Sequence, residues 1–274
     1  ELSFNLTSSM VDAVEKLVAG NSITVTSIHN FCPIPDGVSR EVALPDFYSM
    51  SSKDQEQRNL AVRQAKITID TAARLKARAV VLHCGRVETR DRTVDLIALF
   101  NQGRKNTVDF VSLRDDIMRE RDGLKKPFLD NTLRSLEDLN KYAALRNIKL
   151  GVETRYYFRE IPFFDEIGVI LDAFRDSQVY YWHDTGHAQL MENLGFIADH
   201  EDFFRLYGSR LLGVHLHDIT GCSDHQPPGT GEFDFGRVKP YLLRDTIKVI
   251  EAHRPATGAQ LVQSSEFLEN LFNG

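Results

Sequence analysis

Residues 211–215 read Leu-Leu-Gly-Val-His, a short apolar run closed by an imidazole. Four other runs along the chain are followed in the same way by a histidine or a carboxylate. Short apolar runs separated by stretches with helical periodicity are typical of buried parallel strands. The runs and the residues that close or follow them are 79–82 with His83, 150–152 with Glu153, 179–182 with Asp184, 211–214 with His215, and 260–263 with Glu266.

The residues at the ends of these runs are all of metal-ligand type. In a barrel of parallel strands, the side chains at the carboxyl ends of the strands gather at one mouth. Alternation along a strand places Trp182 and Asp184 on one face of their run, and His215 and His217 on one face of theirs. Buried charges without a partner are costly. The pattern therefore predicts a divalent-metal site at the mouth of a barrel.

Length and composition indicate one globular domain. The chain has 274 residues, of which 42% are hydrophobic and 26% charged, and a barrel of this kind has about 250 residues. We find no linker, repeat or low-complexity tract, and expect a single TIM-barrel domain over residues 1–274. The net charge of −6 weighs against nucleic-acid partners, because phosphate binding needs a basic surface.

The cysteines and the hydropathy pattern indicate the compartment. Cys32, Cys84 and Cys222 are odd in number and widely spaced, which is typical of reduced thiols in the cytoplasm. No apolar run approaches the ~18 residues of a membrane span, and no secretory signal pattern is present. We therefore expect a cytoplasmic protein without a membrane partner. A homo-oligomer is compatible with these features.

Periodicity and capping residues predict the order of elements. We count seven strands instead of the eight of a complete barrel, so the first βα unit is expected to be missing ahead of Glu1, by truncation or disorder at the start of the chain. The long connections 30–52 and 86–128 are expected to overhang the mouth as lids. The expected strands are 2–5, 23–29, 79–84, 149–154, 179–184, 211–217 and 258–266, and the expected helices are 9–19, 53–76, segments within 93–122, 129–147, 163–175, 199–207 and 236–252.

Several short motifs of the chain resemble the xylose isomerase-like TIM-barrel superfamily. This superfamily holds sugar and sugar-phosphate isomerases and epimerases, and the endonuclease IV family of AP endonucleases (AP endonuclease family 2). The motifs are specific for the superfamily and do not choose a substrate. They are Val81-Leu82-His83-Cys84-Gly85, Gly151-Val152-Glu153, His183-Asp184-Thr185-Gly186-His187, Val214-His215-Leu216-His217-Asp218, Pro228-Gly229-Thr230-Gly231 and Ser264-Ser265-Glu266.

The resemblance implies a metal-dependent isomerase or epimerase acting on a small carbohydrate or sugar phosphate. It implies that Glu153, Asp184, His215 and Glu266 bind one divalent metal, and that Glu153 and Glu266 transfer the proton next to a carbonyl. It also implies that His187 contacts a substrate oxygen. An oxygen-rich ligand set with one imidazole favours Mn, Mg or Co, whereas additional histidines favour Zn.

Two other functions stay open. Endonuclease IV enzymes hold a cluster of three metals, and His29, His83, His187 and His225 fall at their extra histidine positions. Against this, Ser223 stands where that family has an aspartate. The chain lacks a clear basic, aromatic DNA-binding loop. A barrel that binds a sugar without catalysis is the third alternative.

Each candidate also has a structural interpretation. Glu153 is compatible with a surface pair with Arg155, and Asp184 with a helix N-cap. His217 is compatible with a role in orienting His215, and His29 with an ordinary hydrogen-bonded histidine. His187 is compatible with a solvated loop, and His225 with a structural role in its loop. Arg155, with Arg86 and Arg159, is compatible with either anion binding or solvation. His183 is expected to be structural, and His200 and His253 to be solvated.

Overall fold

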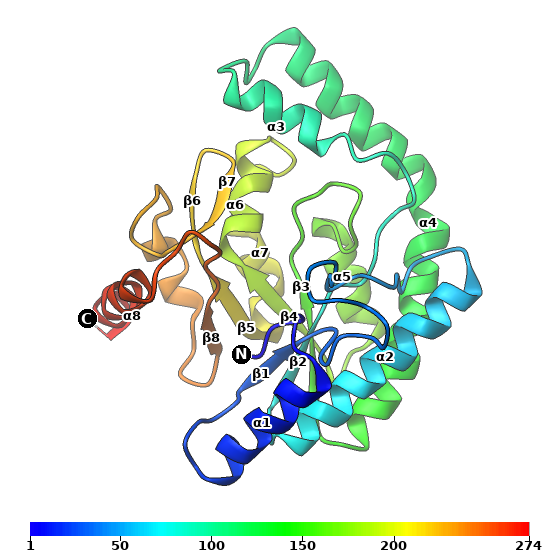
Figure 1. Ribbon diagram of the computed structural model, residues 1–274. Coiled ribbons are helices and arrows are strands. Elements are labelled where there is room, and N and C mark those ends of the chain that lie inside the picture. The colour runs from blue at the N-terminus through cyan, green and yellow to red at the C-terminus, as the bar shows by residue number, and fades with distance from the viewer. Residues whose placement is uncertain (274) are drawn as a thin grey trace. The chain divides into compact units, whose positions relative to one another are not determined.

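The computed structural model describes residues 1–273 (Figure 1). Its main sheet is a parallel sheet of six strands. A separate antiparallel pair joins β6 (Asp218–Thr220) and β7 (Ser223–Gln226). In sheet order, the six strands are β1 (Ser27–His29), β2 (Ala79–Leu82), β3 (Lys149–Glu153), β4 (Val179–Asp184), β5 (Leu211–Leu216) and β8 (Ile247–Ile250).

Helices alternate with these strands, which confirms the expected α/β class. The chain also has 3-10 turns at 208–210, 235–237 and 239–241. The helices are α1 (Ser8–Ala19), α2 (Gln55–Arg74), α3 (Thr93–Asn101), α4 (Val108–Ala144), α5 (Phe164–Ala173), α6 (Thr185–Asn193), α7 (Asp202–Tyr207) and α8 (Gly258–Asn273).

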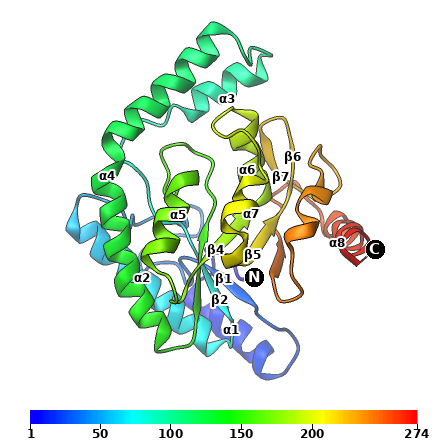
Figure 2. The ribbon, with the colours of Figure 1, turned by 180° about the vertical axis from the view of Figure 1, so that it is seen from behind.

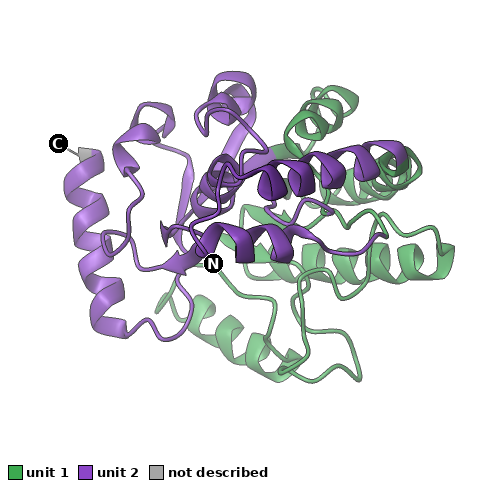
Figure 3. Cartoon of the chain, turned by 90° about the horizontal axis from the view of Figure 1, so that it is seen from above, with its two compact units in different colours: residues 1–88, 124–153, 160–180 green, residues 89–123, 154–159, 181–274 purple. Residues whose placement is uncertain are grey.

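The chain divides into two compact units (Figure 3). The first comprises residues 1–88, 124–153 and 160–180, and the second comprises residues 89–123, 154–159 and 181–274, of which residue 274 lies outside the described part. The single domain expected over residues 1–274 stays a prediction.

The first unit is built on the parallel register of β1, β2 and β3, in which Ile28 pairs with Val80 and Val80 with Leu150. All three side chains are fully buried. Helix α2 covers this core with Ala61, Ala65, Ile69 and Ala72, which recur every three or four residues. The C-terminal half of α4 runs beside α2 (Figures 1 and 2). Tyr142 of α4 donates a 2.7 Å hydrogen bond to Asp70 of α2.

The second unit is built around β4 and β5. Asp184 pairs with His215, so the polar ends of the two strands lie level. Trp182 is fully buried against the backbone of Gly213, where an added Cβ atom would lie 2.3 Å from the indole ring. Strand β8 pairs with β5 on its other side, with His215 opposite Val249. Glu251 follows directly after β8.

The C-terminal part of the expected element order is wrong. The expected helix 236–252 is two 3-10 turns and β8, and the expected strand 258–266 is the first half of α8. Ser264 and Leu268 are buried four residues apart, which is the helical period. Glu266 therefore does not end a strand: it is exposed on α8. Glu251 occupies the position after the last strand.

Other differences are smaller. The expected strand 2–5 is reduced to one parallel bridge between Leu2 and Ile28. The expected helix 129–147 is the end of α4, which begins at Val108 and continues through Pro127. Helix α6 follows β4 without a loop and was not expected. Among the helices of residues 1–273, none has the length and apolarity needed to span a membrane.

Because Trp182 packs against Gly213, a methyl group added at position 213 should lower the stability of the protein. Gly213→Ala forces the indole or the strand to move and should destabilise the protein by about 1–3 kcal/mol. Gly123→Ala is the matched control, because Gly123 lies inside α4 with nothing within 4 Å of an added Cβ. It should stabilise by about 0.5–1 kcal/mol. Urea unfolding measures both, and equal effects would contradict this packing.

Candidate metal centre

In the first unit, two histidines meet Glu153. His83 Nε2 lies 2.8 Å and His29 Nε2 lies 3.5 Å from Glu153 Oε2, and all three side chains are buried. Glu153 is 1% exposed, so the interpretation as a surface glutamate is wrong. The ligand atoms of this trio lie within 4.8 Å of one another.

Hydrogen bonding fixes the tautomer of His29. Its Nδ1 lies 3.0 Å from the carbonyl oxygen of Asn30, and because a carbonyl only accepts, Nδ1 carries the proton. In the neutral ring, Nε2 then turns its lone pair toward the side of Glu153. A histidine that donates one ring N–H to a carbonyl and presents the other nitrogen is typical of a metal ligand.

In the second unit, Asp184, His215 and Glu251 form a buried trio. His215 Nδ1 lies 2.8 Å from Glu251 Oε2 and 3.7 Å from Asp184 Oδ2. His215 and Asp184 are fully buried, and Glu251 is partly exposed. Two carboxylate oxygens beside one imidazole nitrogen make a donor set that suits a divalent cation, which balances the buried negative charge.

Asp184 presents its two oxygens differently. Oδ1 accepts the backbone N–H of His187 at 2.7 Å and the Nε2–H of His217 at 2.8 Å. The first bond is the N-cap of α6, which confirms the capping interpretation of Asp184. Oδ2 is the oxygen that faces the rings of His187, at 3.4 Å, and His215. Capping and hydrogen bonding thus turn Oδ2 toward the other ligand candidates.

His187 is buried, so the interpretation as a solvated residue is wrong. Its Nδ1 lies 3.0 Å from the carbonyl oxygen of Thr154, which assigns the proton to Nδ1. Nε2 lies on the side of Asp224, 3.9 Å from its carboxylate. His187 therefore resembles His29 in its hydrogen bonding and is suited to bind a metal or a substrate oxygen.

His217 has no ring nitrogen to offer a metal. Nε2–H donates to Asp184, and Nδ1 accepts the backbone N–H of His225 at 2.8 Å. His217 orients Asp184, a role the sequence had suggested toward His215.

The loop after β5 carries His225 at its edge. The Asp218 carboxylate accepts the backbone N–H groups of Ile219, Gly229 and Phe233, each at 2.9 Å. His225 Nδ1 lies 3.1 Å from Asp224 Oδ2. Burial raises the pKa of Asp224, but the hydrogen bond and charge of His225 hold it below its usual range.

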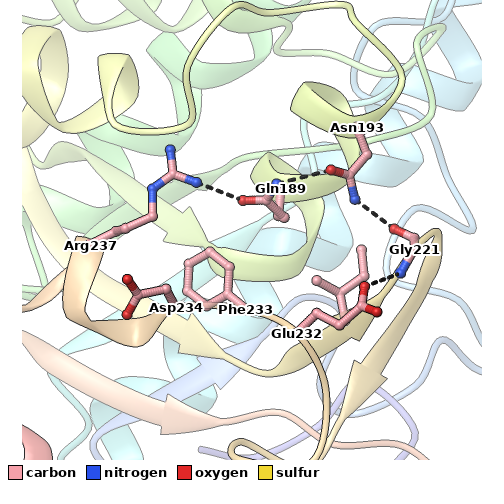
Figure 4. A pocket seen from close by; sticks show the side chains of 8 residues that line it. Gln189, Asn193, Gly221, Glu232, Phe233, Asp234 and Arg237 are labelled. Atoms are coloured by element: carbon pink, nitrogen blue, oxygen red, sulfur yellow. Dashed lines mark hydrogen bonds between the residues drawn. The ribbon is translucent and has the colours of Figure 1, made fainter.

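A pocket of about 250 Å³ lies beside this loop in the second unit. Figure 4 shows a chain of hydrogen bonds along it, from Arg237 to Gln189, then to Asn193, Gly221 and Glu232. These polar groups satisfy one another, and the pocket contains none of the candidate ligands. Its lining residues are Gln189, Asn193, Ile219, Gly221, Glu232, Phe233, Asp234 and Arg237.

Most of the remaining candidate residues are buried. Arg155 is buried in the segment after β3, which excludes full solvation. His183 is buried and lies 2.6 Å from the Tyr181 hydroxyl, in keeping with a structural role. His200 is also fully buried, 2.9 Å from His183, so its expected solvation is wrong. His253 is exposed.

Two residues of the site were missed in the sequence, Glu251 and His253. The signal for Glu251 was the run Ile247-Lys248-Val249-Ile250, whose β-branched residues precede a carboxylate. His253 contacts His225 by ring stacking, with centroids 3.9 Å apart. No local pattern pointed to that contact, since it depends on how the β6–β7 loop folds.

Gly186 lies directly against the His217 ring, so Gly186→Ala tests the role of that ring. An added Cβ would lie 2.1 Å from the His217 ring, so the ring must leave Asp184. Loss of such a supporting contact should weaken divalent-metal binding by about 10–100-fold, measured by calorimetric titration of metal-stripped protein. Gly123→Ala is the matched control, and unchanged affinity in Gly186→Ala would contradict the role of His217.

The buried pair His183–His200 predicts how stability depends on pH. Burial and the charge of Arg237 lower the pKa of His200 to about 3. In the unfolded chain this histidine binds a proton near pH 6.5, whereas in the folded state it stays neutral down to about pH 3. The free energy of unfolding therefore falls as the pH falls from 6.5 toward 3, by up to about 1.4 kcal/mol per pH unit. His200→Gln should flatten this dependence in urea unfolding at pH 4–7. Parallel slopes would show that His200 does not titrate in this way.

Comparisons with known proteins agree with this architecture. A 155-residue stretch is 26% identical to the uncharacterized protein y4fM of Sinorhizobium fredii, covering 56% of this chain and 47% of that protein. The chain thus matches about half the length of this curated relative.

Solved structures share the fold at low sequence identity. The 3-keto-D-glucoside 4-epimerase YcjR of E. coli is 13% identical with a TM-score of 0.64, over 95% of this chain and 84% of that one. The D-psicose 3-epimerase of Clostridium cellulolyticum is 15% identical with a TM-score of 0.64, over 96% and 82%. The expected TIM-barrel fold is confirmed. Residues 1–271 match the family described as xylose isomerase-like TIM barrel, and the chain belongs to that family.

Proposed function

We propose that the protein is a divalent-metal-dependent isomerase or epimerase acting on a sugar or sugar phosphate. The observation that carries the proposal is His215, whose Nδ1 lies between carboxylate oxygens of Asp184 and Glu251. The family and the similar solved structures, which include sugar epimerases, support it.

The proposed ligands are Glu153, Asp184, His215 and Glu251, all at the carboxyl ends of strands in the sheet. Glu251 replaces Glu266 in this set because it follows β8. A bound divalent metal supplies a Lewis acid that polarises the substrate carbonyl. Three carboxylates and one imidazole favour Mn, Mg or Co, and the additional histidines of each unit favour Zn.

Glu153 and Glu251 are the proposed acid/base pair. A hydrogen on carbon next to a carbonyl is weakly acidic, and a positioned carboxylate removes it and returns it. His83 and His29 border Glu153, and His215 borders Glu251. His187 is placed to hold a substrate oxygen through Nε2.

Glutamate-to-glutamine variants test this assignment. Glu153→Gln and Glu251→Gln should each lower turnover by about 10²–10⁴-fold, in a screen of ketoses and sugar phosphates that follows exchange of the carbon-bound proton into deuterated solvent. Glu266→Gln is the matched control, because Glu266 is exposed on α8, and it should keep full activity. Loss of activity in Glu266→Gln alone would overturn the assignment. Binding without proton exchange in the unaltered protein would favour a non-catalytic sugar-binding barrel.

A second candidate is an AP endonuclease resembling endonuclease IV. The specific observation is the number of histidines: His29 and His83 border Glu153, and His187 and His225 border Asp224. A histidine-rich set is typical of Zn. The net charge of −6 weighs against it. Cleavage of an abasic duplex in the presence of Zn or Mn would favour this function, and inactivity would leave the isomerase as the proposal.

A further inference from the structure

We infer that Asp224 is a substrate-binding residue, which together with His187 holds two neighbouring hydroxyl groups of a sugar. Oδ2 of Asp224 lies 3.9 Å from Nε2 of His187, and both residues belong to the second unit. The inference rests on the proposed function in one respect, since it takes His187 as a contact of the substrate. It adds a residue that the proposed function does not use, and it names the part of the substrate that this residue meets.

The two facing atoms are both hydrogen-bond acceptors. His187 carries its proton on Nδ1, which donates to the carbonyl oxygen of Thr154 at 3.0 Å, so Nε2 of the neutral ring has a lone pair on the side of Asp224. A carboxylate oxygen also only accepts. The two atoms therefore cannot bond to each other, and their separation of 3.9 Å is longer than a hydrogen bond. Donors placed between them would serve both.

The neighbours of Asp224 hold its carboxylate in this position. Asp224 lies in β7, which pairs with β6. The next residue, His225, donates its backbone N–H to Nδ1 of His217 at 2.8 Å, and its own Nδ1 lies 3.1 Å from Oδ2 of Asp224. His225 has a positive φ of 54°, a conformation that a non-glycine residue keeps only where its surroundings enforce it. The carboxylate therefore faces His187 before any ligand arrives.

The location of the pair suits a ligand that enters from solvent and reaches the proposed metal centre. The side chain of Asp224 is 20% accessible, whereas that of His187 is 3% accessible. The His187 ring also contacts the metal centre, because its Nδ1 lies 3.4 Å from Oδ2 of Asp184. A substrate that is bound beside Asp184 and extends past His187 toward solvent would therefore meet Asp224.

The chemistry of the pair selects the group that it binds. One hydroxyl has one hydrogen to donate, so two acceptors require two donors. Hydroxyls on adjacent carbons of a sugar can supply them, one to His187 and one to Asp224. Although burial raises the pKa of Asp224, the hydrogen bond and charge of His225 hold it below its usual range, so the carboxylate is ionised. A phosphate at this point would meet a like charge, and we expect a part of the substrate that carries hydroxyls.

Calorimetric titration of the Mn²⁺-loaded protein with D-fructose, D-tagatose and D-psicose tests the inference. Asp224→Ala should raise the Kd of the ketose that binds most tightly by about 10–100-fold, because a hydrogen bond to a charged group is lost. Asp224→Asn keeps one acceptor oxygen and should raise the Kd less. Ser223→Ala, at the exposed neighbouring position in β7, is the matched control and should bind like the unaltered protein. An unchanged Kd in Asp224→Ala, or binding of none of the three ketoses by the unaltered protein, would overturn the inference.

Two further measurements separate this inference from the proposed function and from a role in metal binding. If Asp224→Ala binds the ketose more weakly but the unaltered protein exchanges no carbon-bound proton, the inference holds and the isomerase proposal fails. If the unaltered protein exchanges the proton and Asp224→Ala keeps both its Kd and its turnover, only the inference fails. Elemental analysis should find the same metal content in Asp224→Ala as in the unaltered protein. Loss of an ion would make Asp224 a metal ligand and end its assignment to the sugar.

Discussion

A single hydrogen bond, from Nε2 of His217 to Oδ1 of Asp184, links the parts of the second unit that carry chemistry. It takes up one carboxylate oxygen and turns the other toward His215. It also fixes which nitrogen of His217 is protonated, and so allows the ring to accept the backbone N–H of His225. The bond requires a glycine at position 186, since any side chain there would occupy the space of the imidazole. The N-cap of α6, the strand end of β4 and the β6–β7 loop therefore meet at one contact.

The buried histidines near the candidate ligands differ in how many ring nitrogens the protein itself uses. His29 and His187 each donate Nδ1–H to a backbone carbonyl and keep Nε2 for a ligand. His217 uses both nitrogens within the protein and has none to give. This distinction matters for the proposed metal centre, because more histidines lie near it than have a ring nitrogen to offer an ion. The two oxygens of Asp184 differ in the same way. Oδ1 accepts two hydrogen bonds within the protein, and Oδ2 faces the other candidate metal ligands.

The sequence predicted most of the strand ends and failed at the last one. His83, Glu153, Asp184 and His215 follow runs that are buried on both faces, so continuous apolar residues revealed them. Strand β8 has only four residues, and Lys248 is exposed on it, so it lacks that signature. In residues 260–266 only Leu261 and Val262 are apolar, and the burial of Ser264 and Leu268, four residues apart, distinguishes a helix from a strand. Glu251 was missed for this reason. The pairing of His225 with His253 depends on loop geometry that no local pattern contains.

The three backbone groups bound by Asp218 have a consequence for motion. One carboxylate holds residues 219, 229 and 233, so the beginning and end of the loop share an anchor. The loop carries His225 on one side, and Phe233 of the pocket in Figure 4 lies at its end. Displacing the pocket wall would strain the same anchor that supports the histidine. Asp218, which is not among the proposed ligands, thus supports both the loop of His225 and the segment that lines the pocket.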